Sequence, residues 1–442
     1  MKLLARIGVV IAVVAAMAAP SGALAKNSAT RFGTPIKLTP DYGGGYEPDV
    51  LVDKYGNIFV TAHKEVAEDA VSPDMRSPTY TRSMSWLWLS TNDGKTFGDM
   101  PGYPLDLENH DFGDEGDLAL DDANHLYFVD TNVADVTFTR WTVTGRGKIS
   151  IDLHRPVLPA GEPVDDRPWV TAHGNGHVFY FGNEGDKSSY PLGQSDPGSG
   201  PGRYTVYQSY NGGLTWNSLG YTLPDSGWCR PAADHRPGSP YVYAACTNDA
   251  GKLYAYASSN DGHTFKRYTM GTYNKKDATY SWPTIQVAPD GSIWVIYVDG
   301  NKVDANGIPT TNTVWLYHST NHGRTWTRKD ITPMKGRYEY AWIAVTRDGK
   351  HLGFGTYYRR DNKSPWYVYG TIFKPGARPV LTSIDPQNQV APASSTDAPH
   401  DLMASSFGPD GHLSVVWHRS VILYGPNEGD AVYRDVYFSR SL

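Results

Sequence analysis

The sequence predicts an all-β protein, a β-propeller of seven blades, because two repeats occur together with a turn-rich composition. The longer repeat occurs seven times in the 442 residues and combines a polar segment, an alternating apolar strand, a turn with Gly, and a second apolar strand. A short turn motif occurs four times. The 45 Gly, 31 Pro, 30 Tyr and 13 Trp are typical of many short strands joined by tight turns, and long amphipathic helical patterns are absent.

The overall composition indicates a globular protein with a sizeable core. Hydrophobic residues make up 40% of the chain, which at this length buries enough apolar surface to fold without cross-links. The 40 Lys and Arg residues nearly balance the 46 Asp and Glu residues, giving a formal net charge of -6, and they form no basic run. Neither nucleic acid nor an anionic membrane surface is therefore indicated as a partner.

The first 25 residues are predicted to be a signal peptide, and residues 26–442 a single propeller domain. Lys2 and Arg6 form a basic start, residues 7–19 are apolar, and residues 23–25 (Ala-Leu-Ala) match a cleavage site. No later apolar run approaches the roughly 20 residues of a membrane-spanning helix. We therefore expect a secreted or periplasmic protein with no membrane span.

Only two cysteines are present, Cys229 and Cys246, and they bracket one predicted hairpin. In an oxidising compartment, a disulfide across that hairpin is favoured over a metal site. The sequence contains no zinc motif and no phosphate-binding Gly loop, so no cofactor is expected.

The short repeat has the pattern S-x-N-x-G-x-T-[FW], and each of its residues suits a tight turn between two strands. The Asn side chain caps backbone N–H groups, Gly takes a positive φ, and Thr adds a local hydrogen bond. The closing aromatic is expected to pack beneath the turn. The four copies are Ser90 to Phe97, Ser209 to Trp216, Ser258 to Phe265, and Ser319 to Trp326.

This motif resembles the Asp box, or BNR repeat, of the sialidase-like β-propeller superfamily. That family usually carries Asp where this chain has Asn in all four copies, at Asn92, Asn211, Asn260 and Asn321. Either side chain supplies the capping oxygen. The resemblance implies a propeller fold, and because the best-known members have six blades, a six-bladed propeller is the alternative prediction.

The seven long repeats predict one four-stranded blade each. They start near Glu47, Glu115, Asp166, Arg230, Trp282, Tyr340 and His400. Successive starts lie about 50 to 68 residues apart, the length of a blade with an occasional long loop. The gap between the first two turn motifs spans two blades, so the second blade is expected to carry a degenerate motif around residues 139–141.

The two ends of the predicted domain are expected to meet in one blade. Residues 435–442 resemble a third strand that ends where a turn motif should begin, and residues 30–40 resemble the fourth strand that follows a motif elsewhere. A propeller must seal its last blade to its first to avoid a bare sheet edge. We therefore predict that the N-terminal strand completes blade seven.

The loops that lead into the innermost strands of a propeller gather around the central axis on one face. The residues expected there are Glu47, Asp49, Asp114, Glu115, Asp117, Asp165, Asp166, Arg167, Arg230, Tyr280, Trp282, Tyr338, Glu339, Tyr340, His400 and Asp401. Acidic, basic and aromatic groups of this kind can grip and stack on a sugar, so carbohydrate is the expected ligand. The turn motifs fall on the opposite face and are expected to be scaffold.

The resemblance to sialidase-like propellers also implies a reaction, glycoside hydrolysis of an acidic sugar by a secreted enzyme. In that family three Arg side chains hold the sugar carboxylate, and here Arg167, Arg230 and Arg359 (or the adjacent Arg360) are the candidates. Further candidates for substrate contacts are Trp282, Tyr280, His400, Asp166 and Glu115.

The same resemblance suggests catalytic residues. The family uses a Tyr nucleophile helped by a Glu, together with an Asp acid/base. Tyr338 with Glu339 is the candidate pair, and Asp114 or Asp117 the candidate acid. The family's Arg-Ile-Pro signature is missing from the first blade, and only Arg167-Pro168 and Arg230-Pro231 are similar to it.

Two other functions remain open. In both, the chain is expected to be a monomer whose partner is a carbohydrate or a protein. The first is a propeller that binds glycan or protein without catalysis. The second is a polysaccharide lyase, for which His173, His235, His400 and Tyr280 are candidate bases. The acidic run at residues 111–122 lacks Ca²⁺-loop spacing and alternates as a strand does, so a structural role is favoured there.

Overall fold

The structure is a computed structural model of the chain. It describes residues 29–40, 44–65, 85–103, 115–131, 136–156, 168–184, 203–248, 250–274, 282–303, 309–392, 402–422 and 432–442. The described residues form 28 strands and no α-helix. Within these ranges there is accordingly no helix able to cross a membrane.

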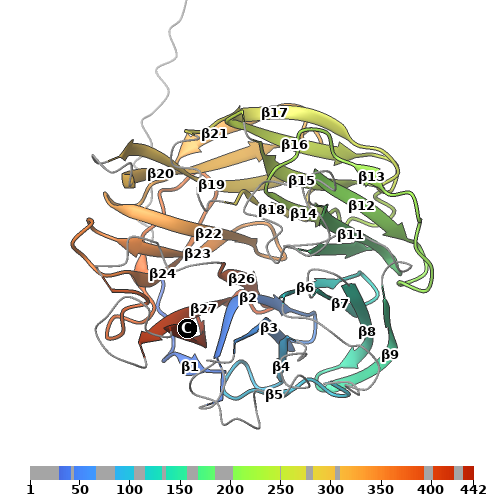
Figure 1. Ribbon diagram of the computed structural model, residues 1–442, viewed down its shortest axis with the longest axis horizontal. Coiled ribbons are helices and arrows are strands. Elements are labelled where there is room, and N and C mark those ends of the chain that lie inside the picture. The colour runs from blue at the N-terminus through green and yellow to red at the C-terminus, as the bar shows by residue number, and fades with distance from the viewer. Residues whose placement is uncertain are drawn as a thin grey trace, which may run out of the picture.

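The strands form seven antiparallel sheets of four strands each (Figure 1). Blade one contains β2 (Gly44–Val52), β3 (Ile58–Glu65), β4 (Trp86–Ser90) and β5 (Gly98–Asp99). Blade two contains β6 (Glu115–Leu120), β7 (His125–Thr131), β8 (Val136–Gly145) and β9 (Lys148–Pro156). Blade three contains β10 (Trp169–His173), β11 (His177–Glu184), β12 (Arg203–Ser209) and β13 (Tyr221–Thr222). Blade four contains β14 (Cys229–Ala233), β15 (Val242–Thr247), β16 (Lys252–Ser258) and β17 (Lys266–Thr272).

The last three blades follow the same order. Blade five contains β18 (Thr284–Val287), β19 (Ile293–Val303), β20 (Pro309–Ser319) and β21 (Thr327–Asp330). Blade six contains β22 (Arg337–Val345), β23 (Leu352–Arg359), β24 (Tyr367–Phe373) and β25 (Thr382–Ser383). Blade seven contains β26 (Ala404–Phe407), β27 (Leu413–Ile422), β28 (Val432–Arg440) and β1 (Ile36–Lys37).

The innermost strands β2, β6, β10, β14, β18, β22 and β26 form a closed ring, because each of them contacts the innermost strand of both neighbouring blades. Figure 1 shows the seven sheets radiating from this ring. The all-β, seven-bladed prediction is therefore confirmed, and the six-bladed alternative is wrong.

Blade seven is completed by the N-terminal strand, as predicted. β1 pairs with β28 through Ile36 opposite Phe438 and Lys37 opposite Tyr437. The Lys37 ammonium lies 3.0 Å from a carboxylate oxygen of Asp435. The first and last described segments are thus joined through one sheet.

The core lies mainly between blades, where the apolar faces of neighbouring sheets meet. One cluster joins Phe59 of blade one to Leu118, Phe128 and Trp141 of blade two. Trp141 is fully buried, and its indole N–H donates a 3.0 Å hydrogen bond to the carbonyl of Pro101. Alternation along each strand places such side chains between the sheets.

We name the two faces of the propeller by the innermost strands. These strands begin at the upper face and end at the lower face. Because successive strands run antiparallel, the turns from first to second strand and from third to fourth strand both lie at the lower face. The backbone N–H of Gly212, in the turn motif of blade three, donates a 2.8 Å hydrogen bond to Gly176 in the first turn of that blade.

The four S-x-N-x-G-x-T turns adopt one geometry. In blade three, Asn211 Oδ1 accepts the backbone N–H of Thr215 at 2.9 Å, and Ser209 Oγ accepts that of Gly213 at 2.8 Å. Gly213 has φ of 87°, as the motif predicts. The closing Trp216 packs edge-to-face on Phe138 of blade two at 5.1 Å, so the motif also joins neighbouring blades.

Replacing Asn211 with Ala should lower the free energy of unfolding by about 1 kcal/mol, because it leaves the Thr215 N–H without its side-chain acceptor. Asn211→Asp is the matched control, since a carboxylate retains that acceptor, and it should cost much less. Urea unfolding of both variants measures the difference. Equal losses in both variants would contradict the capping role.

Blade two differs from the prediction of a degenerate motif around residues 139–141. These residues lie inside β8, paired with β7 and β9. The third and fourth strands of this blade are instead joined by a tight turn at Arg146 and Gly147, with Gly147 at φ of 67°. A two-residue hairpin needs no motif, because Gly alone satisfies the turn.

The predicted disulfide is confirmed. Cys229 and Cys246 are bonded and lie directly opposite each other on β14 and β15. Both are fully buried in the core cluster that includes Trp169, Trp282 and Trp342. The bond therefore anchors the first residue of β14, immediately before Arg230.

Candidate functional site

Arg230 of β14 reaches toward the innermost strands of other blades. Its Nη1 donates a 2.7 Å hydrogen bond to Asp117 Oδ1 on β6, and its Nη2 lies 3.8 Å from Asp49 Oδ2 on β2. The guanidinium carbon lies 4.2 Å from the ring centre of Trp169 on β10 and 4.7 Å from that of Trp342 on β22. We call these five residues the Arg230 cluster, and they join blades one, two, three, four and six.

The electrostatics of the cluster are set by two acidic groups facing one cation. Asp117 is fully buried, and burial raises its pKa well above the ordinary value. The Arg230 charge opposes this rise in pKa, and the nearby Asp49 carboxylate adds to it. The backbone N–H of Val170 donates to Asp117 Oδ2 at 2.7 Å. Burial and the Arg230 charge thus act on Asp117 in opposite directions, and two carboxyl groups share one guanidinium.

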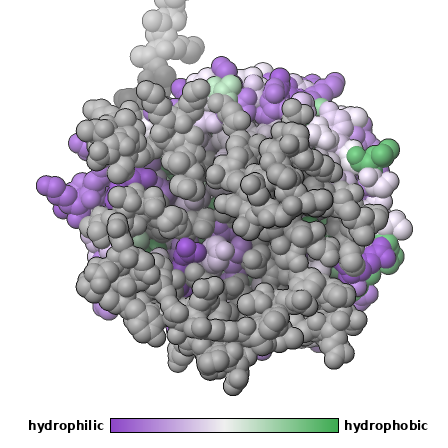
Figure 2. Space-filling model, viewed as in Figure 1, coloured by the Kyte–Doolittle hydropathy of each residue, from purple (hydrophilic) through white to green (hydrophobic). Residues whose placement is uncertain are grey.

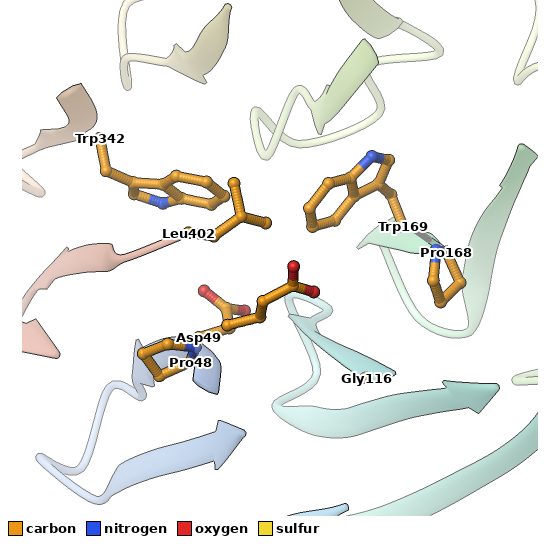
Figure 3. A pocket seen from close by; sticks show the side chains of 8 residues that line it. Pro48, Asp49, Gly116, Pro168, Trp169, Trp342 and Leu402 are labelled. Carbon is orange, nitrogen blue, oxygen red and sulfur yellow. The ribbon is translucent and has the colours of Figure 1, made fainter. Parts of the chain in front are cut away.

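A small pocket lies at the axis, and we call it the upper pocket. Its lining residues are Glu47, Pro48, Asp49, Gly116, Pro168, Trp169, Trp342 and Leu402. Figure 3 shows the indoles of Trp169 and Trp342 on opposite sides, with Leu402 between them and Asp49 nearby. The enclosed volume is about 10 Å³, room for one water molecule.

Glu47 brings a second carboxylate to this pocket through an irregular backbone. The pairing of β2 with β3 shifts between Tyr46 and Asp49, and Glu47 there has φ of 50°. A positive φ at a residue other than Gly is strained, and such bulges often re-aim side chains at functional sites. Glu47 Oε2 lies 3.0 Å from Nε2 of the buried His63.

Tyr338, the candidate nucleophile, lies in the core beside blade five. Its side chain is fully buried, its hydroxyl donates to the carbonyl of Met334 at 2.5 Å, and the N–H of Met334 donates back at 3.0 Å. Burial raises its pKa, which opposes formation of the phenolate. The structure does not bring Tyr338 to the upper pocket.

Glu339 and Arg359 lie together in blade six rather than in the Arg230 cluster. Glu339 forms an ion pair with Arg337 at 2.5 Å, and Arg337 stands opposite Arg359 in the pairing of β22 with β23. The guanidinium of Arg359 lies 4.6 Å from the ring of Trp366 and donates to Asn362 at 3.1 Å. The neighbouring candidate Arg360 is largely exposed and pairs with Asp361.

The remaining predicted residues divide into two groups. Trp282 packs edge-to-face on Trp169 at 5.4 Å and lies 4.5 Å from Trp228, so it supports the wall of the upper pocket from behind. Five other candidates lie outside the described residues: Asp114, Asp166, Arg167, Tyr280 and His400. Glu115 is the first residue of β6, and only its backbone is described.

A larger cavity, the lower cavity, opens at the lower face. Its volume is about 540 Å³, and it is lined by the second halves of innermost strands and the turns that follow them. Its charged lining residues are Lys54, Asp121, Asp122, Arg230, His235, Arg236 and Arg347, so Arg230 separates this cavity from the two indoles of the upper pocket. Asp121 caps the first turn of blade two, where it accepts the N–H of His125 at 2.8 Å, consistent with a structural role for this part of the acidic run.

Sequence reasoning missed Trp169, Trp342 and His63. Trp169 and Trp342 stand in innermost strands, yet an indole at such a position looks like ordinary core. His63 lies on a second strand, where no loop signal points to the axis.

Among the described side chains on the face in Figure 2, hydrophilic ones predominate and hydrophobic areas are small.

No protein-family model matches the sequence, and no curated protein matches it. The fold is similar to that of a GH74 enzyme from Niastella koreensis, with 15% identity and a TM-score of 0.52 over 88% of this chain and 52% of that one. The chain thus spans about half the length of that enzyme. More distant matches include an intramolecular trans-sialidase from Ruminococcus gnavus (13% identity, 90% and 94% coverage, TM-score 0.44). Another is a PL25 ulvan lyase (10% identity, 92% and 94% coverage, TM-score 0.47). At these identities the likeness concerns the fold.

Proposed function

We propose that the chain is an exported, glycan-active propeller that binds an acidic sugar at the upper pocket and hydrolyses its glycosidic bond. The observation that carries the proposal is the grouping, on the propeller axis, of two carboxylates and two indoles around one arginine. Glu47 and Asp49 line the pocket with Trp169 and Trp342, and Arg230 lies against both indoles.

This arrangement supplies the groups that glycoside hydrolysis requires. Glycosidases use paired carboxyl groups, one to protonate the leaving oxygen and one to assist the attacking nucleophile. Glu47 and Asp49 are the pair that lines the pocket, and His63 sits within 3.0 Å of Glu47 to exchange or hold a proton. Arg230 provides positive charge for the carboxylate of an acidic sugar, while Asp117 holds it in position.

The fold and the predicted export fit this proposal. The protein with the similar fold, a GH74 enzyme, shows that such a fold can support catalysis, although one fold hosts many functions. The predicted signal peptide lies outside the described residues, and export would place the disulfide in an oxidising compartment. We expect the protein in the secreted or periplasmic fraction.

The test is a turnover screen of the purified protein against sialosides, uronate polymers and neutral glycans, with binding measured in parallel. Glu47→Gln should lower turnover by about 10²- to 10⁴-fold, the usual contribution of an acid–base group. Asp348→Asn is the matched control, because this half-exposed carboxylate lies in a lower-face turn. Full turnover by Glu47→Gln would exclude its catalytic role.

A second candidate function, glycan binding without cleavage, is favoured by one observation. The upper pocket encloses room for about one water, and the Arg230 guanidinium is already held by Asp117 and two indoles. A ligand would then rest on the pocket rather than enter it. Glycan binding with no detectable turnover across the screen would establish this second function.

A further inference from the structure

Three potential metal ligands meet at the lower face, between blades three and four. His173 ends β10, His177 begins β11, and Asp261 lies in the S-x-N-x-G-x-T turn between β16 and β17. His173 Nε2 lies 2.9 Å from Asp261 Oδ1, and His177 Nδ1 lies 3.1 Å from Asp261 Oδ2. The ligand atoms of this His-Asp cluster all lie within 4.8 Å of one another.

The contacts within the cluster are close but are not hydrogen bonds. His173 Nε2, His177 Nδ1 and Asp261 Oδ1 are buried and have no hydrogen-bond partner among the described residues. Two ring nitrogens and a carboxylate oxygen are therefore buried close together without hydrogen bonds among the described residues. A cation between them would satisfy all three groups.

The surrounding residues hold the three ligands in place. The His173 ring stacks on Phe179 at 5.4 Å, and the His177 ring meets Tyr210 edge-on at 5.3 Å. The Tyr210 hydroxyl donates a 2.7 Å hydrogen bond to the backbone carbonyl of Asp261. Metal ligands are commonly oriented by neighbours of this kind, so that little rearrangement is needed on binding.

We propose that the His-Asp cluster binds one divalent transition-metal ion, with Zn²⁺ the best match, and that this ion clamps blade three to blade four. Imidazole and carboxylate ligands suit Zn²⁺, Ni²⁺ and Cu²⁺ better than Ca²⁺ or Mg²⁺. Bonds of 2.0–2.1 Å in a tetrahedral site place ligand atoms about 3.3 Å apart. His173 and His177 contact different oxygens of Asp261, at 2.9 and 3.1 Å, and the ligand atoms lie within 4.8 Å of one another, so one ring must shift toward the shared oxygen when the ion binds.

The cluster supplies three protein ligands, which leaves one tetrahedral position open. An open position is typical of zinc sites that hold a water molecule or a small ligand. The site is separate from the upper pocket, because it lies at the opposite face of the propeller. The inference therefore stands or falls independently of the glycan-active proposal.

The test uses the purified full chain without a polyhistidine tag, stripped of metal with EDTA and then titrated with Co²⁺ and Zn²⁺. One equivalent of Co²⁺ should produce the visible absorption bands of a tetrahedral site, and Zn²⁺ should displace it. Zn²⁺ should also raise the thermal midpoint of unfolding, because an ion that binds only the folded state stabilises it. Neither readout depends on enzymatic activity.

His177→Ala and Asp261→Asn should each weaken binding at least about tenfold and abolish the thermal shift. His235→Ala is the matched control, since His235 also contacts a carboxylate, Asp122 at 2.8 Å, but in an exposed pair that is not part of the three-ligand set. Asp261→Asn has the same shape as Asp, so its metal-free thermal midpoint reports whether the fold is intact. Absence of Co²⁺ bands in the parent protein, or equal weakening by His235→Ala, would overturn the proposal.

Discussion

Replacing Arg230 with Ala is expected to lower the free energy of unfolding by about 3–5 kcal/mol, the usual cost of removing one partner from a buried ion pair. The change leaves Asp117 and Asp49 facing each other without a cation, and it removes the guanidinium that contacts both Trp169 and Trp342. Urea unfolding followed by tryptophan fluorescence measures the loss.

The loss in free energy of unfolding caused by Arg230→Ala should decrease as the pH is lowered. Asp117 has a raised pKa in the folded protein, so protonation of its carboxyl group favours the folded state. This contribution to the free energy of unfolding is fully present below the ordinary Asp pKa of about 3.9 and is lost as pH rises through the folded-state pKa. Without Arg230 the pKa rises further, because the opposing positive charge is gone. The difference between variant and parent should therefore be largest at neutral pH and shrink toward pH 4.

Arg267→Ala is the matched control for this experiment. Arg267 also pairs with an aspartate, Asp225, and lies 4.6 Å from an aromatic ring, that of Tyr254. Its side chain is 36% exposed, whereas that of Arg230 is 12% exposed. Exposed pairs contribute about 0–1 kcal/mol, so a loss at Arg267 as large as at Arg230 would refute the role of burial.

The double variant Cys229→Ala with Cys246→Ala is expected to lose about 3 kcal/mol of stability. The bond joins residues 17 apart in sequence, and closing a loop of that length restricts the unfolded chain by about this amount. The measurement is urea unfolding at fixed pH, in which the midpoint should fall.

A reducing agent provides an independent check on the disulfide. Both cysteines are 0% exposed, so the folded protein should keep the bond in dithiothreitol, while the unfolded chain loses it. Dithiothreitol should therefore lower the unfolding midpoint of the parent protein and leave that of the double variant unchanged. If dithiothreitol shifted both proteins equally, the shift could not come from this bond.

Much of the fold was predictable because it follows from local chemistry repeated along the chain. The S-x-N-x-G-x-T turns specify a capping acceptor and a positive φ, and both occur at Asn211 and Gly213. The resemblance of residues 435–442 to a third strand and of residues 30–40 to a fourth strand likewise predicts the shared blade seven. Blade two escaped the pattern, because its tight Arg146-Gly147 turn serves the same purpose with no motif at all.

The candidate site was only partly predictable, because it depends on which distant strands meet. Arg230 and Asp117 were expected near the axis, but their pairing spans 113 residues. Glu47 is positioned by a bulge with a positive φ that no local residue pattern announces. The His-Asp cluster was missed for a related reason, since Asp261 belongs to a turn whose residues are all explained by turn chemistry.

The shared blade seven has a consequence for how the molecule is made. β1 pairs with β28, at the other end of the described residues, so the ring stays open until β28 has left the ribosome. A circular permutant that joins residue 442 to residue 29 and opens a lower-face turn elsewhere would build blade seven from contiguous chain. Such a permutant should refold faster than the parent, because its closing contacts span a shorter loop.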